Sequence, residues 1–475
     1  MAKAGAITAD EAAKFADRLP KVVDKKNINR FSGSKGYLLQ LVKDKMVSEL
    51  KFDPSEIDGG GLRIVTTFDY DDQMDAIAAI KQFRPEGAKE LNQSLVSVEP
   101  GTGAVRAMYA GRDYLKNQFN WATNGTQPGS TFKPFAVIAA LENGYSLNTK
   151  LNGNSPLYDD SGKMLTTNQG DSGGASFGNV SLTKATEKSI NTAFVDLVQQ
   201  MDDGPQKVLD AARQAGVPNG PLNEIKADGL PLVTPLGYVK VAPVDMANAY
   251  ATIAAEGKRA DWYVIQKVTD RQGATQYKHK VRTKQAIPED VAADTIAAMQ
   301  TVIRTGSGTN ARTVCSATAG KTGTATAGET KTQHVSSSWF AGFTPKAATA
   351  VMYNRGKNGN ADLEGYMLPA FFGGQIPAKT FQAYMNASLD PSDCGTFPPA
   401  ANIKGDKGTV YVAPKPKPKK TKKPTPKPTR TTRPAPTTPA PTTPAPTTPA
   451  PPEPTTPVCT PDPLGPPCPD GETAD

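Results

Sequence analysis

The stretch SLVSVEPGTGAVRAMYA, residues 94–110, carries the clearest indication of fold class in this chain. Apolar residues alternate with small or polar ones in residues 94–98 and 104–110, and a connection that contains glycine separates the two runs. Alternation with a period of two is typical of strands that bury one face, and short glycine-containing connections join hairpins. The stretch therefore predicts a β-hairpin at the beginning of the main domain.

The segments on both sides of this hairpin predict the rest of the domain. Residues 62–68 are a β-branched run, after which the Asp-rich stretch 69–72 begins an amphipathic helix. Downstream, the patterns predict helices at 131–142, 181–201 and 205–215, strands at 317–325, 336–343 and 349–354, and a helix at 378–389. Helices between an early hairpin and late strands predict an α+β fold, with one antiparallel sheet built from both ends of the domain.

Composition divides the chain into three parts. Residues 1–61 hold helical patterns around 7–19 and 36–50 and are predicted to be a linker module, and residues 62–400 are predicted to be the main domain. Residues 401–475 are rich in lysine, proline and threonine and repeat PAPTT from Pro434, Pro439 and Pro444. Because such a segment buries too little apolar area to offset its ordering entropy, we expect a disordered tail.

The charge distribution separates the tail from the folded body. The formal net charge is +8, and residues 404–433 contain 11 basic residues with Asp406 as their only acid, so the body is only mildly basic. Prolines, not aromatic residues, interrupt these lysines, which favours an extended solvated arm over a nucleic-acid site. We expect cell-wall polymers or an anionic membrane surface as partners of the tail.

The cysteines and the N-terminus give opposite indications about the compartment. The chain has no stretch of about 18 apolar residues and no signal-peptide core near its start, whereas Cys459 and Cys468 flank a proline-rich turn that suits a local disulfide. These two indications conflict. For Cys315 and Cys394, a disulfide between them and two free thiols are equally open alternatives. The sequence has no metal-ligand spacing and no cofactor motif.

Three short motifs carry the chemistry: STFK at 130–133, SIN at 189–191 and KTG at 321–323. Ser-x-x-Lys also occurs at 32–35, 48–51 and 181–184, so context must distinguish Ser130. Ser130 follows Pro-Gly and opens an apolar helix, which places Lys133 one turn later on the same face. A buried lysine beside another cation loses its proton more readily and can activate a serine hydroxyl. Ser181, in contrast, is predicted to be a helix N-cap.

The other two motifs are expected to complete the site. Ser189 and Asn191 lie at a break between helices, where they can point into a cleft, although Ser189 could instead cap the helix that follows. Lys321 lies in a glycine-flanked strand to which a peptide could add as a further strand. The backbone N–H groups of Ser130 and Thr324 are expected to form an oxyanion hole.

The longer strings QPGSTFKP (127–134), VAPVDMANAY (241–250), AGKTGT (319–324) and WFAGF (339–343) resemble the transpeptidase domain of class A, bifunctional penicillin-binding proteins. The resemblance extends from about residue 62 to 389, and residues 1–61 resemble only the linker of that family. It implies the penicillin-binding-protein/β-lactamase-like fold and an extracytoplasmic location at the wall face of the membrane. Neither the membrane helix nor the glycosyltransferase domain of the family is visible before residue 62. The resemblance therefore implies a truncated form of an exported protein, which resolves the conflict between the cysteines and the missing signal peptide.

The resemblance implies a D,D-transpeptidase that forms an acyl-enzyme on D-Ala-D-Ala stem peptides and is trapped by β-lactams. Ser130 would be the nucleophile, Ser189 would pass a proton to the leaving amine, and Lys133 and Lys321 would tune that network. Asn191 would hold the donor amide. Substrate binding would involve the strand residues Thr322, Gly323 and Thr324.

Three other functions share some of these sequence features. A β-lactamase shares the motifs but needs a carboxylate that activates water, and no convincing candidate is present. A D,D-carboxypeptidase differs only in the acceptor of the acyl group, so the sequence separates it weakly. A non-catalytic wall-binding protein would explain the tail but not the intact motif residues.

Overall fold

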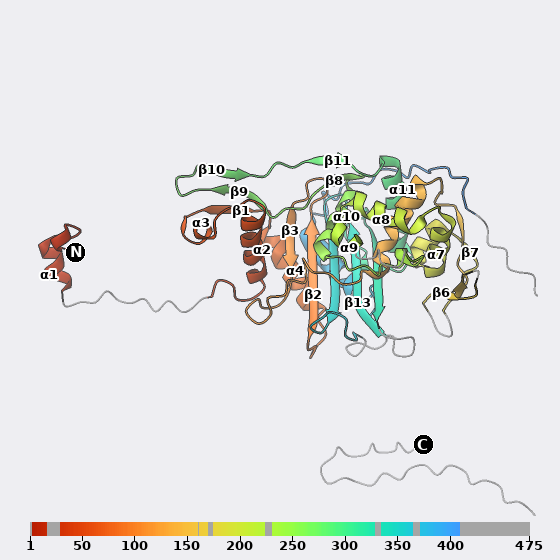
Figure 1. The fold of residues 1–475 in the computed structure, drawn as a ribbon, viewed down its shortest axis with the longest axis horizontal. Coiled ribbons are helices and arrows are strands. Elements are labelled where there is room, and N and C mark those ends of the chain that lie inside the picture. Colours follow the sequence, from red (N-terminus) through yellow and green to blue (C-terminus); the bar gives the residue numbers. More distant parts are fainter. Residues whose placement is uncertain are drawn as a thin grey trace, which may run out of the picture. The chain divides into compact units, whose positions relative to one another are not determined.

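The computed structural model describes residues 2–16, 29–159, 161–169, 174–223, 230–327, 334–363 and 371–408 (Figure 1). The predicted tail beyond residue 408 and the proposed Cys459–Cys468 disulfide lie outside the described residues. Within the described ranges, no helix has both the length and the apolar composition that crossing a bilayer requires.

A five-stranded antiparallel sheet forms the centre of the fold, with the strand order β12-β13-β14-β2-β3. The early hairpin β2–β3 joins the late strands where Val98 pairs with Ala348, so the predicted assembly of one sheet from both ends is confirmed. The strands are β2 Leu91–Val98, β3 Val105–Tyr109, β12 Ala319–Ala327, β13 His334–Phe343 and β14 Ala348–Arg355.

The two faces of this sheet bury two different sets of helices, because side chains alternate along each strand. Leu95 faces one hydrophobic cluster with α4 (Tyr70–Gln82) and α12 (Ile376–Ser388), whereas Val96 faces the other. The second cluster includes α5 Lys133–Glu142, α7 Asn191–Gln200, α8 Gly204–Ala215, α10 Pro243–Ala254 and α11 Glu289–Arg304. Helices thus flank both faces of the sheet, and the predicted α+β architecture is confirmed (Figure 1).

The N-terminal residues, which were predicted to be a linker module, also contribute buried side chains to the main core. Helix α1 spans Ala9–Phe15, α2 Lys35–Ser48 and α3 Pro54–Gly59. Tyr37 and Met46 of α2 are buried in the main core, and the Tyr37 hydroxyl donates to the carbonyl of Asn117. Strand β1 (Arg63–Thr66) pairs with β9 (Ile265–Thr269), so the β-branched run at 62–68 contributes to a separate small sheet.

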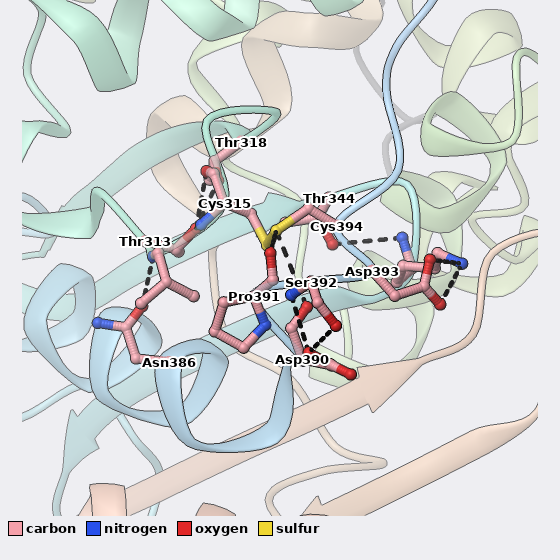
Figure 2. Close-up of a disulfide and its surroundings, with 12 residues drawn as sticks. Thr313, Cys315, Thr318, Thr344, Asn386, Asp390, Pro391, Ser392, Asp393 and Cys394 are labelled. Atoms are coloured by element: carbon pink, nitrogen blue, oxygen red, sulfur yellow. Dashed lines mark hydrogen bonds and ion pairs between the residues drawn. A yellow bond between two sulfur atoms is a disulfide. The ribbon is translucent and has the colours of Figure 1, made fainter.

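A disulfide joins Cys315 and Cys394, with their Cα atoms 5.5 Å apart (Figure 2). Cys315 is buried just before β12, and its carbonyl accepts a hydrogen bond from the Thr318 hydroxyl at 2.7 Å. Cys394 follows α12. Of the two alternatives that the sequence left open, the structure has the bonded form, which links the beginning of β12 to the end of the closing helix.

The predicted tail begins too early at residue 401. The buried carboxylate of Asp294 on α11 accepts the backbone N–H groups of Asn402 and Ile403, each at 2.8 Å. The Lys407 N–H donates to the carbonyl of Gly144 at 3.2 Å. Because these backbone groups find partners in the body, the folded part extends at least to residue 407.

Candidate active site

The turn that carries Ser130 is held between the sheet edge and α10. Ser130 lies in a 3₁₀ turn, Gly129–Phe132, and the α-helix proper begins at Lys133, two residues later than predicted. Gly129 has φ +56°, and a Cβ atom there would lie 2.5 Å from the carbonyl oxygen of Thr324, so only glycine fits. The Tyr250 hydroxyl donates to the carbonyl of Thr131 at 2.7 Å and fixes the turn from the other side.

Lys133 is fully buried, and its amine is surrounded by acceptors. Its Nζ lies 2.7 Å from the carbonyl oxygen of Ser189, 2.8 Å from Oδ1 of Asn191 and 3.2 Å from Oγ of Ser189. Desolvation, and next the positive charge of Lys321, lower the pKa of Lys133 well below its ordinary value. A neutral amine can donate to the two carbonyl-type oxygens and keep its lone pair for a hydroxyl proton, as a general base must.

Ser189 occupies the break between α6 (Leu182–Lys188) and α7 (Asn191–Gln200). Its backbone is left-handed, with φ +58°, and its side chain does not cap α7, whose N-cap residue is Ile190. Instead, Oγ accepts a hydrogen bond from Nζ of Lys321 at 2.7 Å. The interpretation of Ser189 as a cap of the following helix is therefore wrong.

Asn191 is the first residue of α7 and lies between two partners. Its Oδ1 accepts from Lys133, and its Nδ2 donates to the carbonyl of Thr167 at 2.9 Å. The neighbouring Asn168 accepts the backbone N–H of Thr192 at 3.0 Å, which anchors the same segment to the beginning of α7. These contacts hold one wall of the cleft against the helix that carries Asn191.

Lys321 lies in β12, at the edge of the central sheet, and is also fully buried. Burial lowers its pKa to about 7. Its amine contacts Ser189 and the carbonyl of Thr322, at 3.1 Å, so the side chain is directed toward the serine rather than along the open edge. The Thr322 hydroxyl lies 2.8 Å from that of Ser307, and the Thr324 hydroxyl accepts the N–H of Gly373 at 3.2 Å.

Two adjoining hollows of about 590 and 200 Å³ meet at Ser130, Thr324 and Phe372. Asn191 and Thr326 line the larger hollow, which follows the edge of β12. The smaller one is lined by Ser189, Ser307 and Thr322, among others. Gly323 keeps the wall close, because a Cβ atom there would lie 2.2 Å from the carbonyl oxygen of Pro128.

The structure thus brings all three motifs to one cleft, and the other Ser-x-x-Lys serines lie elsewhere in the fold. Ser181 caps α6 by accepting the N–H of Lys184 at 3.1 Å, as predicted. Ser48 ends α2 and Lys51 donates to its carbonyl. In the described ranges, no three His, Cys, Asp or Glu side chains come together as a metal site would require.

Several residues of the cleft have no sequence motif that predicts them. Ser307 and Gly373 reach Thr322 and Thr324 from distant loops, and neither loop has a distinctive pattern. Tyr250 is different. It ends the string VAPVDMANAY at 241–250, one of the strings that resemble the transpeptidase domain of class A penicillin-binding proteins. Its contact with Thr131 gives that string a physical role beside the serine.

Comparison with known proteins shows which family the chain resembles. The penicillin binding protein transpeptidase domain matches residues 93–385. Penicillin-binding protein 1A of Mycobacterium tuberculosis is 31% identical over 392 residues, covering 80% of this chain and 46% of that protein. Penicillin-binding protein 1A of Mycolicibacterium smegmatis is 28% identical over 399 residues, covering 82% and 49%. The chain spans about half the length of these curated relatives.

Solved structures give the same result. The structure of the penicillin-binding protein PonA1 from Mycobacterium tuberculosis has a TM-score of 0.70 and 30% identity, and the match covers 81% of this chain and all of that chain. The PonA1 structure in complex with penicillin V matches equally well, with a TM-score of 0.70 over 80% of this chain. Together with the match over residues 93–385, these similarities show that the chain belongs to the penicillin-binding protein transpeptidase domain family.

Proposed function

We propose that this chain is a serine D,D-transpeptidase that cross-links the stem peptides of peptidoglycan through an acyl-enzyme on Ser130. The observation that carries the proposal is the buried amine of Lys133, which contacts Ser189 and Asn191 one helical turn from Ser130. Family membership supports the reaction type. The location outside the cytoplasm, at the wall face of the membrane, and the contact of the basic tail with wall or membrane belong to the same proposal.

In the first step, neutral Lys133 takes the proton of the Ser130 hydroxyl, and the oxygen attacks the carbonyl carbon of the penultimate D-alanine. The backbone N–H groups of Ser130 and Thr324 donate to the developing oxyanion. The C–N bond then breaks, and D-alanine leaves as an amine after it receives a proton from Ser189. The contact between Ser189 and Lys321 supports this route, because the lysine can replace that proton.

In the second step, the amine of a neighbouring stem peptide attacks the ester carbonyl. The amine loses a proton to the network of Ser189 and Lys133, the C–O bond breaks and Ser130 recovers its proton. One peptide bond has been lost and one formed, so no cofactor or energy source is needed. A β-lactam enters the same first step, but its ring opens when the C–N bond breaks, the leaving amine stays tethered to the acyl group, and the ester persists. PonA1, the similar protein, has been solved with penicillin V.

The donor peptide is proposed to bind in extended form along β12. Strand β12 has a neighbour on one side only, and the larger hollow follows its free edge. A peptide can pair with the backbone there, while Thr322 and Thr324 offer hydroxyls to its terminal carboxylate. Asn191 would hold the donor amide, and Gly323 keeps the strand close to the serine turn.

The decisive experiment supplies a D-Ala-D-Ala stem-peptide donor and a D-amino acid acceptor and separates the products by mass. We expect release of D-alanine and a new amide product from the wild-type protein and neither from Ser130→Ala. Ser181→Ala, which removes the serine of a Ser-x-x-Lys motif outside the cleft, serves as the matched control and keeps both products. Hydrolysis without any amide product would contradict the transpeptidase and support a carboxypeptidase.

A further inference from the structure

A second group of cations lies outside the cleft, on a long antiparallel ribbon. Strands β8 (Lys258–Ala260) and β9 (Ile265–Thr269) form one side, and β10 (Thr275–Lys278) and β11 (Thr283–Gln285) form the other. Between β10 and β11, the N–H of His279 donates to the carbonyl of Gln266 at 2.9 Å, so the pairing continues past β10. Figure 1 shows these four strands following one another as an extended ribbon.

On the β10–β11 side of this ribbon, successive side chains have different surroundings. Tyr277 and His279 are half-buried, with the His279 ring stacked on Tyr263 at 3.5 Å between centroids and Nδ1 of His279 3.0 Å from the Tyr277 hydroxyl. Lys278, which lies between these two rings, and every second residue after it up to residue 284 are exposed cations. We call Lys278, Lys280, Arg282 and Lys284 the cationic row.

The pairing register adds further positive charge to this row. Lys278 lies directly opposite Lys267, and Lys284 lies directly opposite Arg259. Like charges in directly opposed positions destabilise a sheet, so this arrangement lowers stability unless an anion is bound. Arg259 has Asp261 as a partner at 2.7 Å, but in the described part of the chain no ion pair joins a member of the cationic row to a carboxylate.

The row also has a hollow that suits an anionic group. A hollow of about 350 Å³ is lined by Lys278, Lys280 and Arg282, with Asp261 as the single acid. Residues two apart on an extended strand are separated by roughly 6.7 Å, so the four cations span about 20 Å in a line. This is the geometry of a track for a linear polyanion rather than of a pocket for one small molecule.

We propose that the cationic row binds a linear, phosphodiester-linked polyol polymer, with successive phosphates opposite successive cations. The hairpin turn at 270–273 is Asp-Arg-Gln-Gly, without a large apolar residue that could enter a bilayer, which favours a polymer over a membrane surface. The Tyr277 and His279 rings are occupied by each other and by Tyr263, so they are not free to stack on nucleic-acid bases. The inference concerns attachment to the wall and does not depend on the chemistry at Ser130.

The test uses the full chain and a poly(glycerol phosphate) of defined length, titrated at several salt concentrations. The variant Lys278→Gln/Lys280→Gln/Arg282→Gln should bind about 10-fold more weakly or worse at low salt. The slope of log affinity against log salt should become shallower by about 2, because fewer counterions are released. The matched control Lys81→Gln/Lys89→Gln/Lys150→Gln removes three exposed cations elsewhere on the body and should bind like the wild type.

The outcomes separate this surface from the tail and from other anions. The tail is the same in both variants, so an equal loss of affinity in both, or no loss in either, overturns the proposal. The proposal is also overturned if phosphatidylglycerol vesicles or single-stranded DNA bind more tightly than the polymer and their binding depends on the cationic row. Covalent labelling by penicillin should remain unchanged in both variants, which shows that each is folded and keeps failure here distinct from failure of the proposed reaction.

Discussion

The cleft and the ribbon use the same side chain in opposite ways. Lys133 and Lys321 have no exposed surface, and burial lowers the pKa of both. Lys278 and Lys280 are exposed on the ribbon and have no ion-pair partner in the described ranges. Burial turns a lysine from a hydrated cation into a proton acceptor, because the low dielectric penalises only the charged form. Position in the fold, not residue type, therefore separates the proposed base from the proposed docking charges.

The largest expected effect comes from removing the buried base. Lys133→Met keeps most of the side-chain volume but cannot accept a proton, so the acylation rate should fall by roughly 10²–10⁴-fold. Lys280→Met should change that rate less than about twofold. Stopped-flow measurement with a fluorescent penicillin gives both rates, and similar losses in the two variants would remove the distinction between the cleft and the ribbon.

The next prediction concerns the pH dependence of acylation. The base must be neutral, so the rate falls as pH drops and Lys133 becomes protonated. The charge of Lys321 is one cause of the lowered pKa of Lys133, and its loss should raise that pKa. Lys321→Met should therefore move the acidic limb of the pH profile to higher pH, by about one unit. An unmoved limb, or one moved to lower pH, would contradict this coupling.

Stability against pH provides a third comparison. Lys321 has a pKa of about 7 in the folded protein, below its ordinary value of 10.5, so the unfolded chain binds more protons between these values. The free energy of unfolding should thus rise with pH across this window, and this gain should be lost as pH falls toward 7, with a slope on the order of 1 kcal/mol per pH unit at most. Urea unfolding at pH 7.5 and 9 should show a smaller increase in the free energy of unfolding for Lys321→Met than for the wild type. Lys280→Met should show the same increase as the wild type.

The smallest expected effect lies at the rim of the cleft. Ser307 holds the Thr322 hydroxyl at 2.8 Å, and we expect it to be a positioning residue for the substrate carboxylate. Ser307→Ala should raise KM for the stem-peptide donor by roughly 3–10-fold and leave kcat nearly unchanged, since one neutral hydrogen bond is lost. Ser307→Thr keeps the hydroxyl and should restore most of the affinity; a loss in kcat alone would contradict this role.

Local patterns were sufficient to predict the parts of the fold that depend on neighbouring residues. The hairpin at 94–110, the late strands and the N-cap at Ser181 follow from alternation, turn glycines and capping chemistry. The three motifs identified Ser130, Lys133, Ser189, Asn191 and Lys321, and the structure brings these residues into one cleft. Their catalytic roles stay a prediction.

Features that depend on distant partners could not be predicted. The direction of Lys321 toward Ser189 depends on the fold bringing β12 next to the break between α6 and α7, which is far from β12 in the sequence. The pairing of Cys315 with Cys394 and the anchoring of residues 402–403 by Asp294 also depend on tertiary contacts. The opposed cations of the ribbon require the strand register, because a shift of one residue would place them on different faces.

The most direct test of the central claim is the intact mass of the protein after incubation with penicillin. We predict that the wild-type protein and Ser181→Ala gain one covalently bound penicillin each, and that tryptic mapping places the adduct on the peptide that contains Ser130. Ser130→Ala, checked for folding by its thermal melt, should gain none. An adduct on Ser130→Ala equal to that on the wild type, or no adduct on the wild type, would contradict the assignment of Ser130 as the nucleophile.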